Sequence, residues 1–374
     1  MTNGAVAVDC FDEWLAEESA VAALVMRQWL QPVEGKDAIV FPPTYAKPER
    51  VREEDWLAYN IDRFDDGSSV CLIDSVGSQA NRMEPVFKRP SYSDLVPQVT
   101  VEVGAEMVNL LDVGHRAADA VVRFSSLKET LEEAFKSLER GDAEPLAALA
   151  PTSLVFGAWD SRGTQVKIPR ILRSVIRAFD VRPLHRSAQY IPAVDYVGAG
   201  LVDAPQTKAD QDRLSELGLS HAPASWTHGG VQVLGEIRRD ALLSLAALRT
   251  LAAKTPDRTL LLRRYILGLA LVSFTAPLEV VLRQGCELVA DPDRPTVWQL
   301  VRHDGSREPF ALNHADAVIY AQGAAKSFGV EEKERSERFD AQSAKGELAK
   351  SKKERKRSRR SPGAGETSHA ENPE

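Results

Sequence analysis

The chain has 374 residues, of which 43% are hydrophobic and 27% are charged, and its formal net charge is −7. This composition is typical of a globular protein with a real core, and it excludes a chain coated uniformly in positive charge. Three cysteines that lie far apart exclude a disulfide framework and predict a reducing, cytoplasmic compartment.

Composition also predicts the domain organisation. We expect an N-terminal extension over residues 1–17, a folded body over 18–329 and a charged tail, disordered or frayed-helical, over 330–374. The N-terminal stretch turns acidic before any apolar run long enough for a signal peptide. The apolar segment from Tyr265 is interrupted by Pro277, so it predicts a buried helix rather than a membrane span, and no membrane partner is expected.

The first half of the chain alternates helical and strand patterns. Apolar spacing predicts a helix over 18–30 and a strand over 38–46. Residues 60–74 predict a hairpin that turns at Asp66-Gly67, after which a helix is expected to begin. We then expect a strand over 97–103 and a helical stretch over 115–150.

The second half continues this alternation. Strands are expected over 152–159, 188–197 and 229–237, helices over 169–179, 238–253, 258–274 and 315–328, and a hairpin over 296–312. A polar loop is expected between about 202 and 229. This order favours an α+β fold over a doubly wound parallel sheet.

Strong enzyme motifs are absent from the sequence. No phosphate-binding GxxxxGK[ST] loop, dinucleotide fingerprint, HExxH pair or GxSxG elbow is present. The seven histidines are scattered and no zinc spacing of cysteines occurs. We therefore predict no cofactor and no metal site.

Polar and basic clusters remain, and the first is "DSVGSQANRMEP" from Asp74. Asp74 or Ser75 could cap a helix whose free N–H groups favour an anion. The donors Ser78, Gln79, Asn81 and Arg82 would then surround a phosphate or ribose. The competing interpretation is an ordinary capped surface helix.

Four further clusters have similar chemistry. Arg170, Arg173 and Arg177 share one face of the predicted helix over 169–179, although a cationic stripe is more often a solvated face. The other donors are His115 and Arg116 after Gly114, Arg162, Thr164 and Lys167, then Arg186, Gln189 and Tyr190, and finally Arg238 and Arg239. Together these clusters predict a site for nucleic acid or another polyanion.

Several strings resemble the backbone subunit of the type I-G (formerly I-U) CRISPR effector complex, a family in the repeat-associated mysterious protein superfamily. They include "FPPTY", "CLIDSVGSQANRMEP", "NLLDVGHRAADA", "APTSLVFGAWDSRGTQVKIPR", "GEIRRDA" and "LRQGCELV", and the resemblance runs from about Val25 to about Val289. It implies an RNA-recognition-motif (ferredoxin-like) core with helical and loop insertions that form a palm, fingers and a thumb.

The resemblance also implies a function in antiviral defence. Several copies would polymerise along one CRISPR RNA, hold its sugar-phosphate backbone and present its bases to target DNA. Other partners would be the large subunit and the subunit that binds the 5′ handle. The implied RNA contacts are Ser78, Gln79, Asn81, Arg82, His115, Arg116, Arg162, Thr164, Lys167, Arg170, Arg173, Gln189 and Arg238.

Two alternatives remain open. Some members of the superfamily cleave CRISPR repeat RNA, and His115, or His185 with Tyr190, would be the candidates for that activity. Type I backbone subunits are not nucleases, so Asp74 and Asp160 receive no catalytic role. In the second alternative, the basic clusters bind partner proteins.

Overall fold

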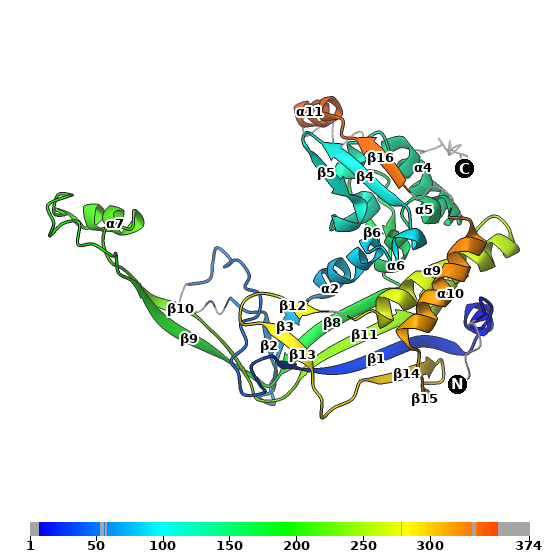
Figure 1. Ribbon diagram of the computed structural model, residues 1–374, viewed down its shortest axis with the longest axis horizontal. Coiled ribbons are helices and arrows are strands. Elements are labelled where there is room, and N and C mark those ends of the chain that lie inside the picture. Colours follow the sequence, from blue (N-terminus) through cyan, green and yellow to red (C-terminus); the bar gives the residue numbers. More distant parts are fainter. Residues whose placement is uncertain (1–6, 53–55, 57, 278, 331–333, 351–374) are drawn as a thin grey trace, which may run out of the picture.

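The computed structural model describes residues 7–52, 56, 58–277, 279–330 and 334–350 (Figure 1). Its centre is a mixed α+β body built on one large antiparallel sheet. The core strands run in the order β13 (Glu287–Ala290), β1 (Val21–Pro32), β11 (Ile237–Ser244) and β8 (Leu172–Phe179). The predicted α+β class is confirmed.

The connections between these strands are those of a ferredoxin-like unit. Helices lie between β1 and β8 and again between β11 and β13, and all neighbouring pairs are antiparallel. A β-α-β-β-α-β chain gives this strand order. Five strands extend the sheet: β3 (Ser69–Asp74) and β2 (Ile61–Arg63) beyond β8, β12 (Val280–Val281) beyond β13, and β14 (Val297–Arg302) with β15 (Arg307–Pro309) along β1.

Helices cover one face of this sheet. The helix α9 (Pro256–Thr275) is buried over most of its length and packs beside α10 (His314–Phe328), while α8 (Leu245–Arg249) continues directly from β11 (Figure 1). A Cβ on Gly268 would lie 2.8 Å from the Cα of Ala321, so only glycine allows α9 and α10 to approach this closely.

A second, smaller lobe lies above the sheet in Figure 1. Its sheet pairs β4 (Gln98–Val103) with β5 (Glu106–Asn109) on one side and, in parallel, with β16 (Glu334–Arg338) on the other. The helices that follow in sequence are α3 (Ala120–Arg123), α4 (Lys128–Glu139), α5 (Glu144–Leu149) and α6 (Thr152–Phe156). Elements from both halves of the chain thus build this lobe.

A long two-stranded ribbon projects from the sheet and ends in α7 (Lys208–Glu216) (Figure 1). It consists of β9 (Val181–Tyr190) and β10 (Ala222–Val233), which directly extend β8 and β11. No residue of β9 is buried, and residues 186–190 at its far end are exposed. The predicted polar loop over 202–229 is therefore wrong in part, since it contains α7 and most of β10.

The folded body extends beyond both of its predicted boundaries, residues 18 and 329. Trp14 and Leu15, from α1 (Asp12–Leu15), are buried in the core, and the Asp12 carboxylate pairs with Arg264 on α9. At the other end, β16 belongs to the folded lobe, so the predicted tail is wrong over Glu334–Arg338. The helix α11 (Ala341–Ala349) agrees with the frayed-helical alternative for this segment. Residues 351–374 of that predicted tail lie outside the described residues.

Several predicted elements are confirmed. The hairpin β2–β3 turns at Asp66-Gly67, where Asp66 Oδ1 accepts from the Ser68 amide and Gly67 has φ +84°. The helix after Asp74, the strand β4, the helices α9 and α10 and the hairpin β14–β15 also lie where the sequence placed them.

Two predicted helices are strands. The helix expected over 18–30 is β1, a central strand with neighbours on both edges, and its nearly continuous apolar run does not distinguish helix from strand. The helix expected over 169–179 is β8, in which Leu172, Ser174 and Ile176 are buried while Arg173 is exposed. The predicted helix over 238–253 is β11 followed by α8, and the predicted strand over 152–159 is mainly α6.

Candidate nucleic-acid interface

The first cluster forms the start of helix α2 (Val76–Met83), directly after β3. Ser75 is the N-cap, and its side chain accepts a hydrogen bond from the Ser78 amide at 3.2 Å. The first N–H groups of an α-helix have no carbonyl partner within the helix, and the positive end of the helix dipole favours a negative charge. The predicted cap is confirmed, and this end of α2 offers donors to an anion.

Arg170 lies over this helix start. A Cβ on Gly77 would be 4.0 Å from an Nη atom of Arg170, which places the guanidinium beside the first turn of α2. Arg170 is exposed, and no ion pair or hydrogen bond joins its side chain to another residue in the described ranges. A free cation next to a positive helix end is a local excess of positive charge that an anion would neutralise.

Gly157 allows the chain to pass close under Arg170. It has φ +79°, and a Cβ there would lie 2.9 Å from both Arg170 Cγ and the carbonyl oxygen of Ile168. The short strand β6 (Ala158–Trp159) begins directly after Gly157, and β7 (Lys167–Ile168) ends just before Arg170. The two strands pair as a hairpin. This hairpin therefore brings its loop to the same surface as the start of α2.

Arg116 supports this surface from beneath. Its side chain is only 3% exposed, its Nε lies 2.7 Å from Glu84 Oε2, and its two Nη atoms donate to Gly157 O and Asn81 Oδ1, each at 3.2 Å. The predicted RNA contact by Arg116 is therefore corrected, because the guanidinium is used inside the protein. It fixes Asn81, which is itself exposed.

Burial perturbs both members of this ion pair. Desolvation raises the pKa of Glu84 to about 7, against the opposing attraction of Arg116. Desolvation also lowers the pKa of Arg116, and the positive charge of Arg170 adds to that effect. Burying this ion pair under the surface therefore costs desolvation free energy.

Gln79 is also inside the protein. Its side chain is fully buried, Nε2 donates to Asp74 Oδ2 at 2.6 Å, and Oε1 accepts from Ser174 Oγ at 2.8 Å. Arg239 Nε donates to the same Ser174 Oγ at 2.9 Å, and desolvation lowers the pKa of Arg239 to about 10. The predicted RNA contact by Gln79 is corrected, since this network connects α2 to β8 and β11.

The remaining donors of the first two clusters reach the surface. Arg82 is 31% exposed and its Nε donates to Asp74 Oδ2 at 3.1 Å, so part of its charge is already compensated. Ser78 is partly exposed, and His115 is exposed at the start of the 3₁₀ turn Arg116–Ala118. We call the group Ser78, Asn81, Arg82, His115 and Arg170 the α2 surface.

The β6–β7 hairpin adds an aromatic side chain that sequence reasoning missed. Trp159 is 57% exposed, and the ammonium of Lys167 lies 5.9 Å from the centre of its ring. In the loop, Asp160 Oδ2 accepts from the amide and the hydroxyl of Thr164, while Arg162 is exposed. An exposed tryptophan next to a lysine was the available signal, because such a pair can stack on a base and contact its phosphate.

The other predicted contacts lie elsewhere. Arg173 and Arg238 are on β8 and β11, where they point away from the covering helices, and Gln189 is exposed near the end of β9. Arg170 and Arg173 do not share a helix face, because this segment is a strand. Arg238 and Arg239 point to opposite faces of β11, and only Arg239 is buried.

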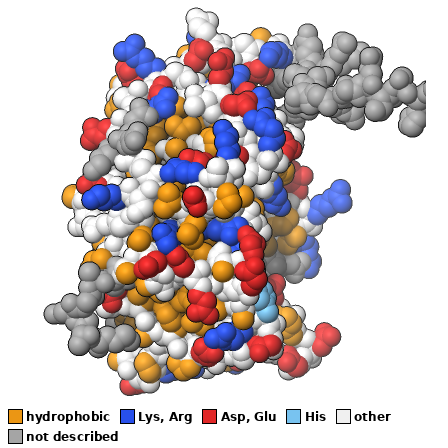
Figure 2. All heavy atoms as spheres, turned by 90° about the vertical axis from the view of Figure 1, so that its right-hand side faces the viewer, with side chains coloured by type: hydrophobic (Ala, Val, Ile, Leu, Met, Phe, Trp, Pro, Cys, Tyr) orange, Lys and Arg blue, Asp and Glu red, His pale blue; other side chains and the backbone are white. Residues whose placement is uncertain are grey.

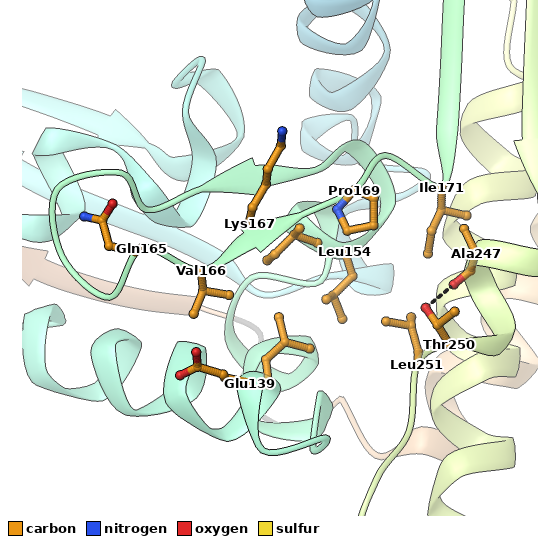
Figure 3. Close-up of a pocket in the computed structure, with 12 residues that line it drawn as sticks. Glu139, Leu154, Gln165, Val166, Lys167, Pro169, Ile171, Ala247, Thr250 and Leu251 are labelled. Carbon is orange, nitrogen blue, oxygen red and sulfur yellow. Dashed lines mark hydrogen bonds between the residues drawn. The ribbon is translucent and has the colours of Figure 1, made fainter. Parts of the chain in front are cut away.

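A cavity of about 380 Å³ lies behind the hairpin (Figure 3). Its wall is mainly apolar, with Leu154, Val166, Ile171 and Leu251, and the Lys167 side chain extends away from it. The face of the molecule shown in Figure 2 mixes Lys and Arg with Asp and Glu around hydrophobic side chains. Neither feature adds to a phosphate-binding surface.

Within the described ranges, no group of three His, Cys, Asp or Glu residues is arranged to hold a metal ion. None of the helices described is both long and apolar enough to cross a membrane. The three cysteines are free thiols, of which Cys71 and Cys286 are buried.

Comparison with known proteins finds a matching family model and matching solved structures. No curated protein matches the chain. A solved structure described as "CRISPR RNA-guided surveillance complex, pre-nicking" is 12% identical, with a TM-score of 0.30 and coverage of 80% of this chain and 82% of that one. The family model described as "CRISPR-associated protein GSU0053" matches residues 24–183, which include the α2 surface and the β6–β7 hairpin. Over this region the chain is similar to that CRISPR-associated family, which confirms the family-level resemblance found in the sequence.

Proposed function

We propose that this protein is a guide-RNA scaffold of a CRISPR effector complex of subtype I-G. The observation that carries the proposal is the free Arg170 beside the start of α2, within the region that matches a CRISPR-associated family. Ser78, Asn81, Arg82 and His115 surround it, and Lys167 and Trp159 extend the surface. The interface binds the sugar-phosphate backbone and leaves the guide bases free.

The character of the donors supports a binding function that does not depend on sequence. The α2 surface offers a helix start, hydroxyl and amide groups and guanidinium groups, all of which suit phosphates and 2′-hydroxyls. Trp159 gives one exposed ring on which any base can stack. A subunit that must accept every guide sequence needs this kind of surface.

In this proposal, the parts of the fold have separate tasks. The central sheet with its helices is the palm, the lobe of β4, β5 and β16 is the fingers, and the ribbon of β9 and β10 is the thumb. The ribbon carries the exposed apolar side chains Ile191, Val194 and Leu201 near its tip. Several copies polymerise head to tail, which requires two different complementary surfaces on each copy. The large subunit, the 5′-handle-binding subunit and target DNA complete the complex in the cytoplasm.

Binding rather than cleavage is favoured by the positions of the candidate catalytic groups. Asp74 and Asp160 are buried and accept hydrogen bonds from within the chain. His185 and Tyr190 are five residues apart on one strand, so they point to opposite faces of the ribbon. His185 and Tyr190 therefore do not form one site, and His115 is the remaining candidate for the endonuclease alternative among the described residues.

The test is to coexpress the chain with a CRISPR array and to measure the mass and RNA content of the purified product. We expect a large ribonucleoprotein with one RNase-resistant guide and several copies of the chain. The experiment is repeated with the other subunits present, because assembly on the guide could require another subunit to start it. A chain that stays free of RNA under both conditions would overturn the proposal.

A further inference from the structure

The central sheet has one face that the helices do not cover, and the proposed guide site does not include this face. Along β11, Ile237, Arg239, Ala241 and Leu243 are buried on the helix side, and the alternate residues are only partly buried. The same alternation in β8 turns Arg173 and Arg177 away from the helices. We call the outward residues Arg27, Trp29, Arg173, Arg177, Phe179 and Arg238 the sheet face.

Strand register brings these residues together. Arg177 on β8 is opposite Arg238 on β11, which is opposite Trp29 on β1. Two residues further along β11, Asp240 is opposite Arg27 on β1. Three adjacent strands therefore present arginine and aromatic side chains side by side on one face.

Some of these arginines are held by the protein. Arg238 pairs with Glu236 at 2.6 Å and with Asp240 at 2.9 Å, and its guanidinium lies 4.5 Å from the centre of the Phe179 ring. Arg27 is more than half exposed and makes a single contact with Asp240, at 3.3 Å. These contacts orient the side chains and compensate part of their charge.

Arg173 and Arg177 are different, because neither has an ion pair or hydrogen bond with its side chain anywhere in the described ranges. They are four residues apart on one strand, so they are separated by roughly 13 Å. Two unpaired charges at this distance match an extended polyanion better than a single small anion.

We propose that the sheet face binds a second single-stranded nucleic acid, separate from the guide RNA on the α2 surface. Arginine alone supplies the cations of this face, and its planar fork suits phosphate oxygens. Leu242 lies opposite Arg173 and Val25 lies opposite Leu242, so apolar side chains adjoin this charge and can contact bases. In RNA-recognition motifs, aromatic side chains of a four-stranded sheet stack on two or three bases of single-stranded RNA.

The test uses a labelled oligo-dT and a labelled oligo-U, neither of which is complementary to the guide. Binding is measured as a function of salt for the purified complex and for the full chain without RNA. The double variant Arg173→Gln/Arg177→Gln should weaken binding about tenfold in 0.1 M salt and lower the salt slope by about 1.4. The control Arg89→Gln/Arg213→Gln removes the same charge from exposed positions elsewhere and should change little.

Guide content, measured on the same preparations, separates this proposal from the proposed function. The proposal predicts an unchanged guide content and mass in the Arg173→Gln/Arg177→Gln complex. Loss of the guide would overturn it by assigning these arginines to guide binding, and unchanged oligonucleotide affinity with failed copy assembly would assign them to a protein interface. An equal loss in both double variants would also overturn it. Comparing oligo-dT with oligo-U shows whether the strand is DNA or RNA.

Discussion

Glu84 and Arg116 form an ion pair of 2.7 Å in which neither side chain is more than 3% exposed. The pair lies under the α2 surface, and Arg116 also holds Asn81. Removing one partner of a buried pair leaves an uncompensated charge, whereas replacing both partners with apolar residues of similar volume is often neutral. Because burial raises the pKa of Glu84 to about 7, the support of the proposed guide site depends on pH.

Glu84 gives the pH prediction. Its pKa in the folded chain is about 7, above the ordinary value of 4.5, so protonated Glu84 contributes stability that is present at low pH and lost as pH rises through 7. The full effect is on the order of 3 kcal/mol. Urea unfolding between pH 5 and 8 should show this decline in the wild type and a flatter profile in Glu84→Gln. The exposed Glu139→Gln variant should follow the wild type, and parallel profiles for all three proteins would contradict the assignment.

Gln79→Leu tests the corrected role of Gln79. The substitution leaves Asp74 and Ser174 without their amide partners, so the free energy of unfolding should fall by about 2 kcal/mol. Guide RNA per folded molecule should be unchanged, because the side chain does not reach the surface. Exposed Gln206→Leu is the control for stability. A variant that loses RNA at unchanged stability would restore the direct contact that the sequence suggested.

Arg170→Ala tests the α2 surface. Loss of one phosphate contact should lower the slope of log affinity against log salt by about 0.7 for single-stranded RNA, at unchanged thermal stability. Arg170→Lys should recover part of the affinity, because charge remains while the planar fork is lost. The exposed Arg213→Ala on α7 is the matched control. Equal slopes for Arg170→Ala and the wild type would remove Arg170 from the interface.

Two truncations test the boundary of the folded body. A chain that ends after Val330 loses β16 and uncovers the edge of β4, so it should unfold at lower temperature and aggregate. A chain that ends after Lys350 keeps β16 and α11, and it should lose only nonspecific affinity for nucleic acid, since the basic run at 352–360 is removed. Similar melting temperatures for both truncations would show that β16 contributes little.

The sequence predicted local features better than it predicted the sheet. The Ser75 cap, the turn at Gly67 and the buried helix α9 depend on neighbouring residues or on long apolar periodicity, and all are present. The central strands β1 and β8 were assigned as helices because their pairing depends on strands far away in sequence. Propensity was informative for β8, where the β-branched Val175 and Ile176 favour a strand.

The candidate site was predictable in composition but not in exposure. Ser78, Asn81, Arg82 and Arg170 were identified from residue type, and they lie near one another. Gln79 and Arg116 have the same chemistry and are buried, because a donor can satisfy an internal partner as well as a ligand. Gln79 is buried by the packing of α2 against β8, and Arg116 by its pairing with Glu84.

The parallel pairing of β16 with β4 has a consequence for synthesis on the ribosome. Glu334 lies opposite Gln98, so 236 further residues must be added before β4 can gain its second neighbour. At roughly 5–20 residues per second, the nascent chain exposes that strand edge for about 10–50 s. The smaller lobe is therefore completed at the end of translation, and ribosomes that stall before residue 338 hold a chain whose sheet still has an open edge.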